Sequence, residues 1–210
     1  MWIIRLVLLV LLIASVGVFG VFLRRRTRAG FGQLLENRPI NLFGVIAYNL
    51  ACYLLAALPS DPGVFASPAW LADPFVAGGF LATGLGLIGL AAAFMLASVR
   101  QRKTVGGENV KAGLLTDGVY RFARHPIYAA ISGMSLGLAL VFRSWDGILM
   151  IPFIFAINLM EGGIEERYDI GARFPKEYGE FRKRTRPFGS AWFWVGLAGI
   201  LLVIMGVSSL

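Results

Sequence analysis

The only histidine of this chain stands where a polar stretch meets an apolar one. His125 lies between Arg124 and Pro126, within the segment GVYRFARHPIY at 118–128. Proline is favoured at the first position of a helix, so a helix is expected to begin at Pro126. The free N–H groups and the positive dipole end of that helix favour a carboxylate or a hydroxyl-rich ligand. His125 therefore marks a candidate binding site.

A second polar segment, rich in acidic residues, follows at 161–188. Glu161, Glu165 and Asp169 recur every four residues, so they share one face of a helix. For Glu161 and Asp169 we expect a solvated face that balances nearby arginines. A carboxylate that faces inward at Glu165 or Glu166 is instead suited to hold a cationic or hydroxyl-rich cofactor.

Aromatic residues accompany both polar segments. Tyr120 and Tyr128 flank the histidine, and each of them alone is more often an anchor at the membrane interface. Pro175 is expected to open a short helix in which Tyr178 and Phe181 share one face. We expect this helix to lie on the membrane surface or to cover the site beneath it.

The composition is that of an integral membrane protein. Of 210 residues, 57% are hydrophobic and 15% are charged, whereas a soluble domain has about 25% charged residues. The net charge of +8 comes from basic clusters that alternate with apolar segments, which is the positive-inside pattern and argues against nucleic-acid binding. Cys52 is the only cysteine, and no cluster of metal-ligating residues accompanies it, so no disulfide and no metal site are expected.

The apolar segments predict an all-α, polytopic membrane protein with about six transmembrane helices. Both termini and the acidic, proline-rich loop 59–74 are expected outside, and the basic clusters inside. The segment that begins at 147 is expected to continue into the cytosol through 168. We expect one membrane domain over 1–210, with N-terminal helices in 1–103, a core in 104–188 and a last helix in 189–210. The six segments are about 2–23, 40–58, 75–99, 126–142, 147–160 and 191–207.

A glycine motif at 84–89, GLGLIG, matches the G-x-G-x-x-G pattern of dinucleotide-binding proteins. That interpretation requires a preceding strand and a βαβ unit. The motif here lies inside an apolar segment, where small residues allow helices to approach closely. We therefore interpret it as a helix-packing motif.

Taken together, the polar blocks resemble those of the isoprenylcysteine carboxyl methyltransferase and phospholipid methyltransferase superfamily. That superfamily carries Gly-x-Tyr and Arg-His-Pro-x-Tyr, then a glutamate pair and Phe-Gly-x-x-Tyr-x-x-Tyr. The resemblance covers about 111–188. In this chain Pro175 replaces the glycine and Phe181 replaces the second tyrosine, so the motif does not determine the substrate pocket. The matching residues are Gly118, Tyr120, Arg124, His125, Pro126, Tyr128, Glu165, Glu166, Phe174, Tyr178 and Phe181.

The resemblance implies an enzyme that binds S-adenosylmethionine in a cytoplasm-facing pocket without a Rossmann fold. It implies contacts from His125, Tyr128 and either Glu165 or Glu166. The methyl acceptor would be lipophilic, such as an isoprenylcysteine-type carboxylate or a phospholipid, entering from the surrounding membrane lipids. A carboxylate needs no general base, whereas an amine must first lose a proton, so no catalytic residue is assigned. The remaining residues of the implied cofactor site are Tyr120, Arg124, Pro126 and Tyr178.

Two other functions remain open from the sequence. Sterol-type membrane reductases that use NADPH share the Arg-His-Pro block but carry asparagine after the proline, where this chain has Ile127. A non-enzymatic membrane protein, such as a transporter, should carry polar residues near the bilayer midplane. Here only Asn49 and Asn158 stand out in that region, and the other polar residues gather at one predicted surface. The residue after the proline argues against a reductase, and the placement of the polar residues argues against a transporter. Both observations therefore favour methyl transfer.

Overall fold

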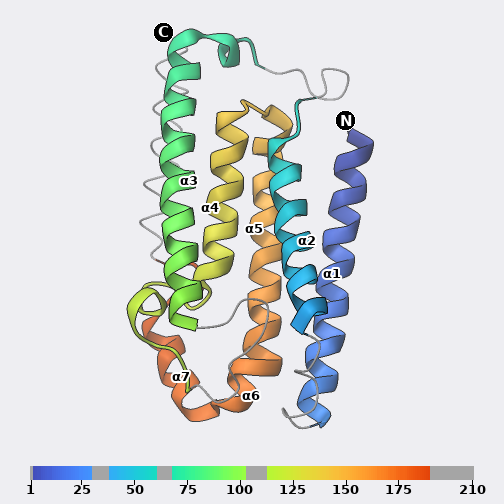
Figure 1. Cartoon of the computed structure of the whole chain (residues 1–210), viewed down its shortest axis with the longest axis vertical. Coiled ribbons are helices and arrows are strands. Elements are labelled where there is room, and N and C mark those ends of the chain that lie inside the picture. Colours follow the sequence, from blue (N-terminus) through green and yellow to red (C-terminus); the bar gives the residue numbers. More distant parts are fainter. Residues whose placement is uncertain (1, 30–37, 61–67, 103–112, 190–210) are drawn as a thin grey trace.

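The computed structural model describes residues 2–29, 38–60, 68–102 and 113–189. In these ranges the chain is all-α, and its long helices run alternately up and down in one bundle (Figure 1). Each of the first five predicted segments forms a helix, although α1 continues to Ala29, beyond its predicted end at 23, and the fourth helix begins at Pro126 as expected. The sixth predicted segment, 191–207, lies outside the described residues. The long helices are α1 (Trp2–Ala29), α2 (Arg38–Ala57), α3 (Pro74–Arg102), α4 (Pro126–Val141) and α5 (Trp145–Glu165).

Shorter elements follow α5 and lie at the end of the bundle opposite the N-terminus (Figure 1). The helix continues as a π-helical turn, η3 (Glu166–Ile170), and then as α6 (Gly171–Arg173). Pro175 opens α7 (Pro175–Arg184), as predicted. Two 3₁₀ turns, η1 (Ala69–Ala72) and η2 (Gly118–Arg121), precede α3 and α4 respectively.

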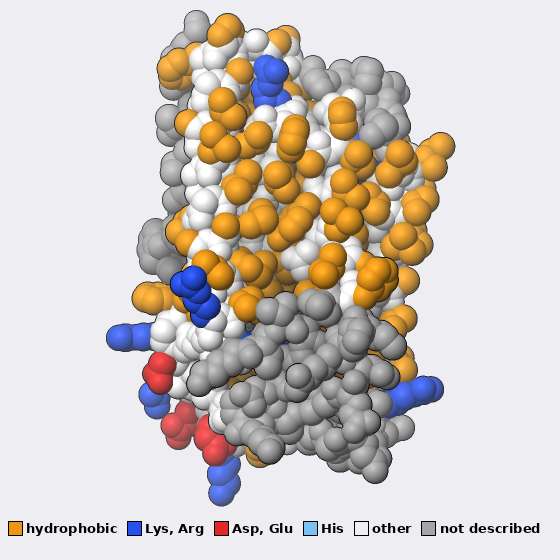
Figure 2. All heavy atoms as spheres, in the orientation of Figure 1, with side chains coloured by type: hydrophobic (Ala, Val, Ile, Leu, Met, Phe, Trp, Pro, Cys, Tyr) orange, Lys and Arg blue, Asp and Glu red, His pale blue; other side chains and the backbone are white. Residues whose placement is uncertain are grey.

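The helices have the length and composition of membrane spans. Three of them, Trp2–Arg25, Pro74–Arg102 and Trp145–Arg173, are long and apolar enough to cross a bilayer, and Phe43–Ala57 and Pro126–Val141 are shorter apolar helices. Figure 2 shows hydrophobic side chains along the bundle, with charged side chains gathered toward the end that carries α6 and α7. The polytopic, all-α architecture is therefore confirmed for the described residues.

α4 occupies the middle of the bundle and contacts α2, α3 and α5. Its Ile131 packs with Leu12 of α1, Leu55 of α2 and Ile154 of α5 in one buried cluster. Another cluster joins α4 to α3. Lipid tails are as apolar as these side chains, so close packing and polar contacts hold such helices together more than exclusion of water does.

The glycine motif of α3 serves this packing at one position. A Cβ atom on Gly84 would lie 2.7 Å from the backbone oxygen of Gly137 in α4, and one on Gly137 would lie 2.8 Å from the oxygen of Gly84. Gly86 and Gly89 instead have nothing within 4 Å of such an atom. Because the motif lies inside a helix, the packing interpretation agrees with the structure.

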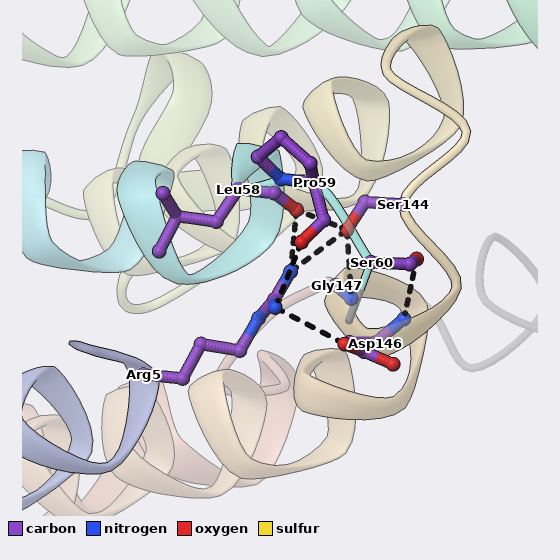
Figure 3. Close-up of polar contacts among 7 residues, drawn as sticks. All are labelled: Arg5, Leu58, Pro59, Ser60, Ser144, Asp146 and Gly147. Atoms are coloured by element: carbon purple, nitrogen blue, oxygen red, sulfur yellow. Dashed lines mark hydrogen bonds and ion pairs between the residues drawn. The ribbon is translucent and has the colours of Figure 1, made fainter. Parts of the chain in front are cut away.

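A buried ion pair ties together three parts of the chain at the N-terminal end of the bundle (Figure 3). Arg5 of α1 lies 3.1 Å from the Asp146 carboxylate at the start of α5, and neither side chain is exposed. Arg5 also donates to Ser144 and to the carbonyl oxygens of Leu58 and Pro59, which follow α2. The sequence reasoning missed this cluster because its members lie far apart in the chain.

Candidate functional site

The candidate site forms where the start of α4 meets the segment that follows α7. The backbone N–H of Arg124 donates to the carbonyl of Arg186 at 3.0 Å, and that of His125 donates to Pro187 at 2.9 Å. The guanidinium of Arg124 also donates to the carbonyl oxygens of Arg182 and Thr185. Through these hydrogen bonds Arg124 holds the end of α7 beside the first turn of α4.

One oxygen of Glu166 joins the arginine and the histidine. Its Oε1 accepts hydrogen bonds from Arg124 Nε and from His125 Nε2, each at 2.9 Å. Hydrogen bonds to ionised groups are roughly twice as strong as those between neutral groups, so this cluster organises the site.

Glu165 approaches the other side of the histidine ring. Its Oε2 lies 3.4 Å from His125 Nδ1, and its Oε1 lies 3.5 Å from a guanidinium nitrogen of Arg102 in α3. The sequence left open which glutamate faces the site, and the structure places both against His125. They do so where α5 passes into the π-helical turn, a local irregularity that often occurs at functional sites.

A glycine makes room for the histidine. A Cβ atom on Gly162 of α5 would lie 3.0 Å from Cδ2 of the His125 ring. A larger residue would therefore push the ring away from Glu165 and Glu166. The sequence reasoning overlooked Gly162, although a Gly-Gly pair directly after Glu161 was a signal of close approach.

The predicted tyrosines surround the cluster at different distances. The ring of Tyr128 lies 5.7 Å from that of His125, centre to centre. Tyr120 and Tyr178 are buried in an aromatic cluster with Phe181, so the predicted shared face of α7 points inward. The hydroxyl of Tyr178 is buried and makes no hydrogen bond within the described part of the chain. Burial and the nearby Glu166 carboxylate both raise the pKa of Tyr178, which keeps its hydroxyl protonated.

The two glutamates set the protonation of the histidine. Burial by itself lowers the pKa of His125, but hydrogen bonds to Glu165 and Glu166 and their negative charges outweigh it, so the pKa is raised above its ordinary value. A protonated His125 donates from both ring nitrogens. The site thus combines two carboxylates with cationic partners.

Two expectations were wrong. Glu161 and Asp169 were predicted on a solvated face, yet they are 7% and 0% exposed. Glu161 faces the bundle, where its side chain interacts with Tyr128 of α4. Asp169 forms a two-point ion pair with Arg173, with distances of 2.8 and 3.0 Å. The spacing along the chain does not show whether these side chains meet water or another helix, and only the packed helices show that they are covered.

One comparison with known proteins found a match. Residues 79–169 match the family model described as phospholipid methyltransferase, a stretch that runs from α3 through Arg124, His125 and both glutamates of the cluster. Over this stretch, which is less than half of the chain, the protein is similar to the membrane methyltransferases that this model describes. Membership in the phospholipid methyltransferase family implies an enzyme that uses S-adenosylmethionine to methylate a lipid acceptor. No curated protein and no solved structure gave a match.

Proposed function

We propose that this membrane methyltransferase binds S-adenosylmethionine at the polar cluster around His125 and Glu166. The observation that carries the proposal is the arrangement of Glu166, whose Oε1 is held by both Arg124 and His125. A carboxylate that two donors hold in a fixed position is preorganised to bind a ligand.

The chemistry of these side chains fits the cofactor. S-adenosylmethionine carries ribose hydroxyls and an amine, which donate to carboxylates, and a carboxylate, which accepts from cations and from helix N-termini. Glu166 and Glu165 supply acceptors, and His125 and the first turn of α4 supply donors. The buried hydroxyl of Tyr178, without a hydrogen-bond partner among the described residues, is a further donor. Tyr120, Tyr128 and Pro126 are proposed to line the same site.

The acceptor is proposed to be a phospholipid or an isoprenylcysteine-type carboxylate that enters sideways from the bilayer. The bound cofactor supplies a methyl group on a positively charged sulfur, so the cofactor itself provides the activated group for the transfer. The side chains of this protein would hold the cofactor in line with the acceptor and keep water away. For a carboxylate acceptor this requires no general base at neutral pH.

Titration calorimetry on the detergent-purified enzyme tests the cofactor site, with NADPH titrated in parallel. We expect saturable binding of S-adenosylmethionine and no binding of NADPH. His125→Ala should weaken binding because it removes a donor that both glutamates face, whereas the protein should still insert and purify. Binding of NADPH alone would support a reductase, and unchanged affinity in the variant would remove His125 from the site.

We further propose that the site faces the cytoplasm, since the basic clusters follow the positive-inside pattern. Glu180 on α7 is exposed and provides a reporter. A Glu180→Cys variant should react with a membrane-impermeant thiol reagent only after the membrane is permeabilised, and the buried Cys52 should stay unlabelled. Labelling of intact cells at this position would reverse the proposed orientation.

A further inference from the structure

A groove of about 650 Å³ lies between α1 and α5, on the outside of the bundle. Sites for small molecules have volumes of about 300–1,000 Å³, so its size is sufficient for part of a lipid. Most of the groove is lined by apolar residues and glycines, and its end nearest α6 carries Arg24, Arg167 and Tyr168. The groove is therefore apolar along its length and basic at one end.

Glycines keep this groove open. A Cβ atom added to Gly17 of α1 or to Gly163 of α5 would meet nothing within 4 Å, although both residues line the groove. Gly20 instead contacts the neighbouring helix, since its Cβ would lie 3.5 Å from Ile164. Small residues usually let membrane helices close on each other. Here only Gly20 does so, whereas Gly17 and Gly163 leave the space between α1 and α5 open.

The length of the groove matches one leaflet of a bilayer. Ile13 and Arg24, which mark its ends on α1, lie about 16 Å apart along the axis at about 1.5 Å per residue. Half of a hydrocarbon core measures about 15 Å. An acyl chain in the groove would thus place its headgroup at the level of the arginines.

The two arginines are suited to a phosphate. Arg24 and Arg167 are exposed, and neither forms an ion pair with a carboxylate among the described residues. The guanidinium of Arg167 lies 5.3 Å from the centre of the Tyr168 ring, which orients it. Guanidinium groups bind phosphate oxygens through paired hydrogen bonds, so this end of the groove is complementary to an anionic headgroup.

The groove is separate from the candidate cofactor site. Gly162 of α5 contacts the His125 ring, whereas the adjacent Gly163 lies in the groove. Successive residues of a helix point about 100° apart, so the two sites use different faces of α5. An occupant of the groove lies away from the cluster at His125.

We propose that the groove between α1 and α5 binds one anionic phospholipid, with an acyl chain along Gly17 and Gly163 and the phosphate at Arg24 and Arg167. This lipid is a resident ligand that joins α1 to α5 and is distinct from the methyl acceptor. The proposal goes beyond the proposed function and does not depend on it.

Native mass spectrometry and thermal unfolding of the detergent-purified protein test the site, with phosphatidylglycerol and phosphatidylcholine added separately. We expect one retained phosphatidylglycerol and a higher Tm with that lipid than with phosphatidylcholine. Arg24→Gln and Arg167→Gln should each weaken its binding by about fivefold, the effect of removing about 1 kcal/mol of attraction per basic residue. Gly163→Leu should abolish it by filling the groove.

Matched variants separate this site from general effects. Arg121→Gln removes an exposed charge on η2, and Gly89→Leu enlarges an open glycine on α3, so both should leave lipid binding unchanged. An equal loss in Arg121→Gln would overturn the proposal in favour of diffuse attraction. Equal stabilisation by soluble glycerol phosphate would also overturn it. The proposal would likewise be overturned if the protein formed a dimer without lipid and the Gly163→Leu substitution dissociated that dimer.

Discussion

Replacing Glu166 by glutamine tests the core of the candidate site, because it keeps the size of the side chain and removes its charge. Oε1 of Glu166 accepts two hydrogen bonds of 2.9 Å, from Arg124 and from His125. Hydrogen bonds to charged groups contribute about 1.5–3 kcal/mol each, and loss of the charge weakens them by roughly half. The two bonds together should therefore lose about 1.5–3 kcal/mol.

If cofactor binding relies on this arrangement, Glu166→Gln should lower the affinity for S-adenosylmethionine by about 10- to 150-fold. Titration calorimetry measures the change, at a temperature below the unfolding transition of both proteins. Glu180→Gln is the control, since its carboxylate is exposed, lies 3.3 Å from Arg184 and belongs to a class of surface pairs that contribute little. Affinity within about twofold of the wild type, in folded Glu166→Gln protein, would refute the reasoning.

Three further changes should alter stability in directions that the structure sets. The folded-state pKa of His125 is raised, so its stabilising contribution is fully present below about pH 6.5 and is lost as the pH rises through the folded-state pKa. The Tm of the protein should therefore be lower at high pH. In the His125→Gln variant, Tm should change less over that part of the pH range. Asp146→Ala should lower the free energy of unfolding by about 3–5 kcal/mol, because it leaves Arg5 buried without its carboxylate; a denaturant titration that finds no change would contradict the role of the ion pair. Gly84→Leu should cost about 1–3 kcal/mol, whereas Gly86→Leu, which faces open space, should be neutral in the same assay.

Some features of the site followed from the sequence for local reasons. Proline fixes its own φ and lacks an N–H, so Pro126 and Pro175 predicted the starts of α4 and α7 correctly. The apolar lengths predicted the membrane helices in the same way. The Arg-His-Pro block and the glutamate pair were recognisable because their spacing within the chain is short.

Burial of the acidic face could not be predicted in this way. Glu161 and Asp169 lie at the same helical spacing as Glu165, and that spacing is compatible with water or with a neighbouring helix on that face. The packing of the bundle decided between the two. The same holds for the glycines, since Gly84 packs against α4 while Gly86 faces open space.

By itself the sequence determined the helical class, the helix starts and the two polar blocks, because each depends on neighbouring residues. Only the tertiary structure placed Arg124 and His125 on the same oxygen of Glu166 and paired Arg5 with Asp146. These contacts join helices that are distant in the chain, and a one-dimensional pattern carries no distance between them. Their geometry depends on how closely the helices pack, which small residues such as Gly84 and Gly162 set.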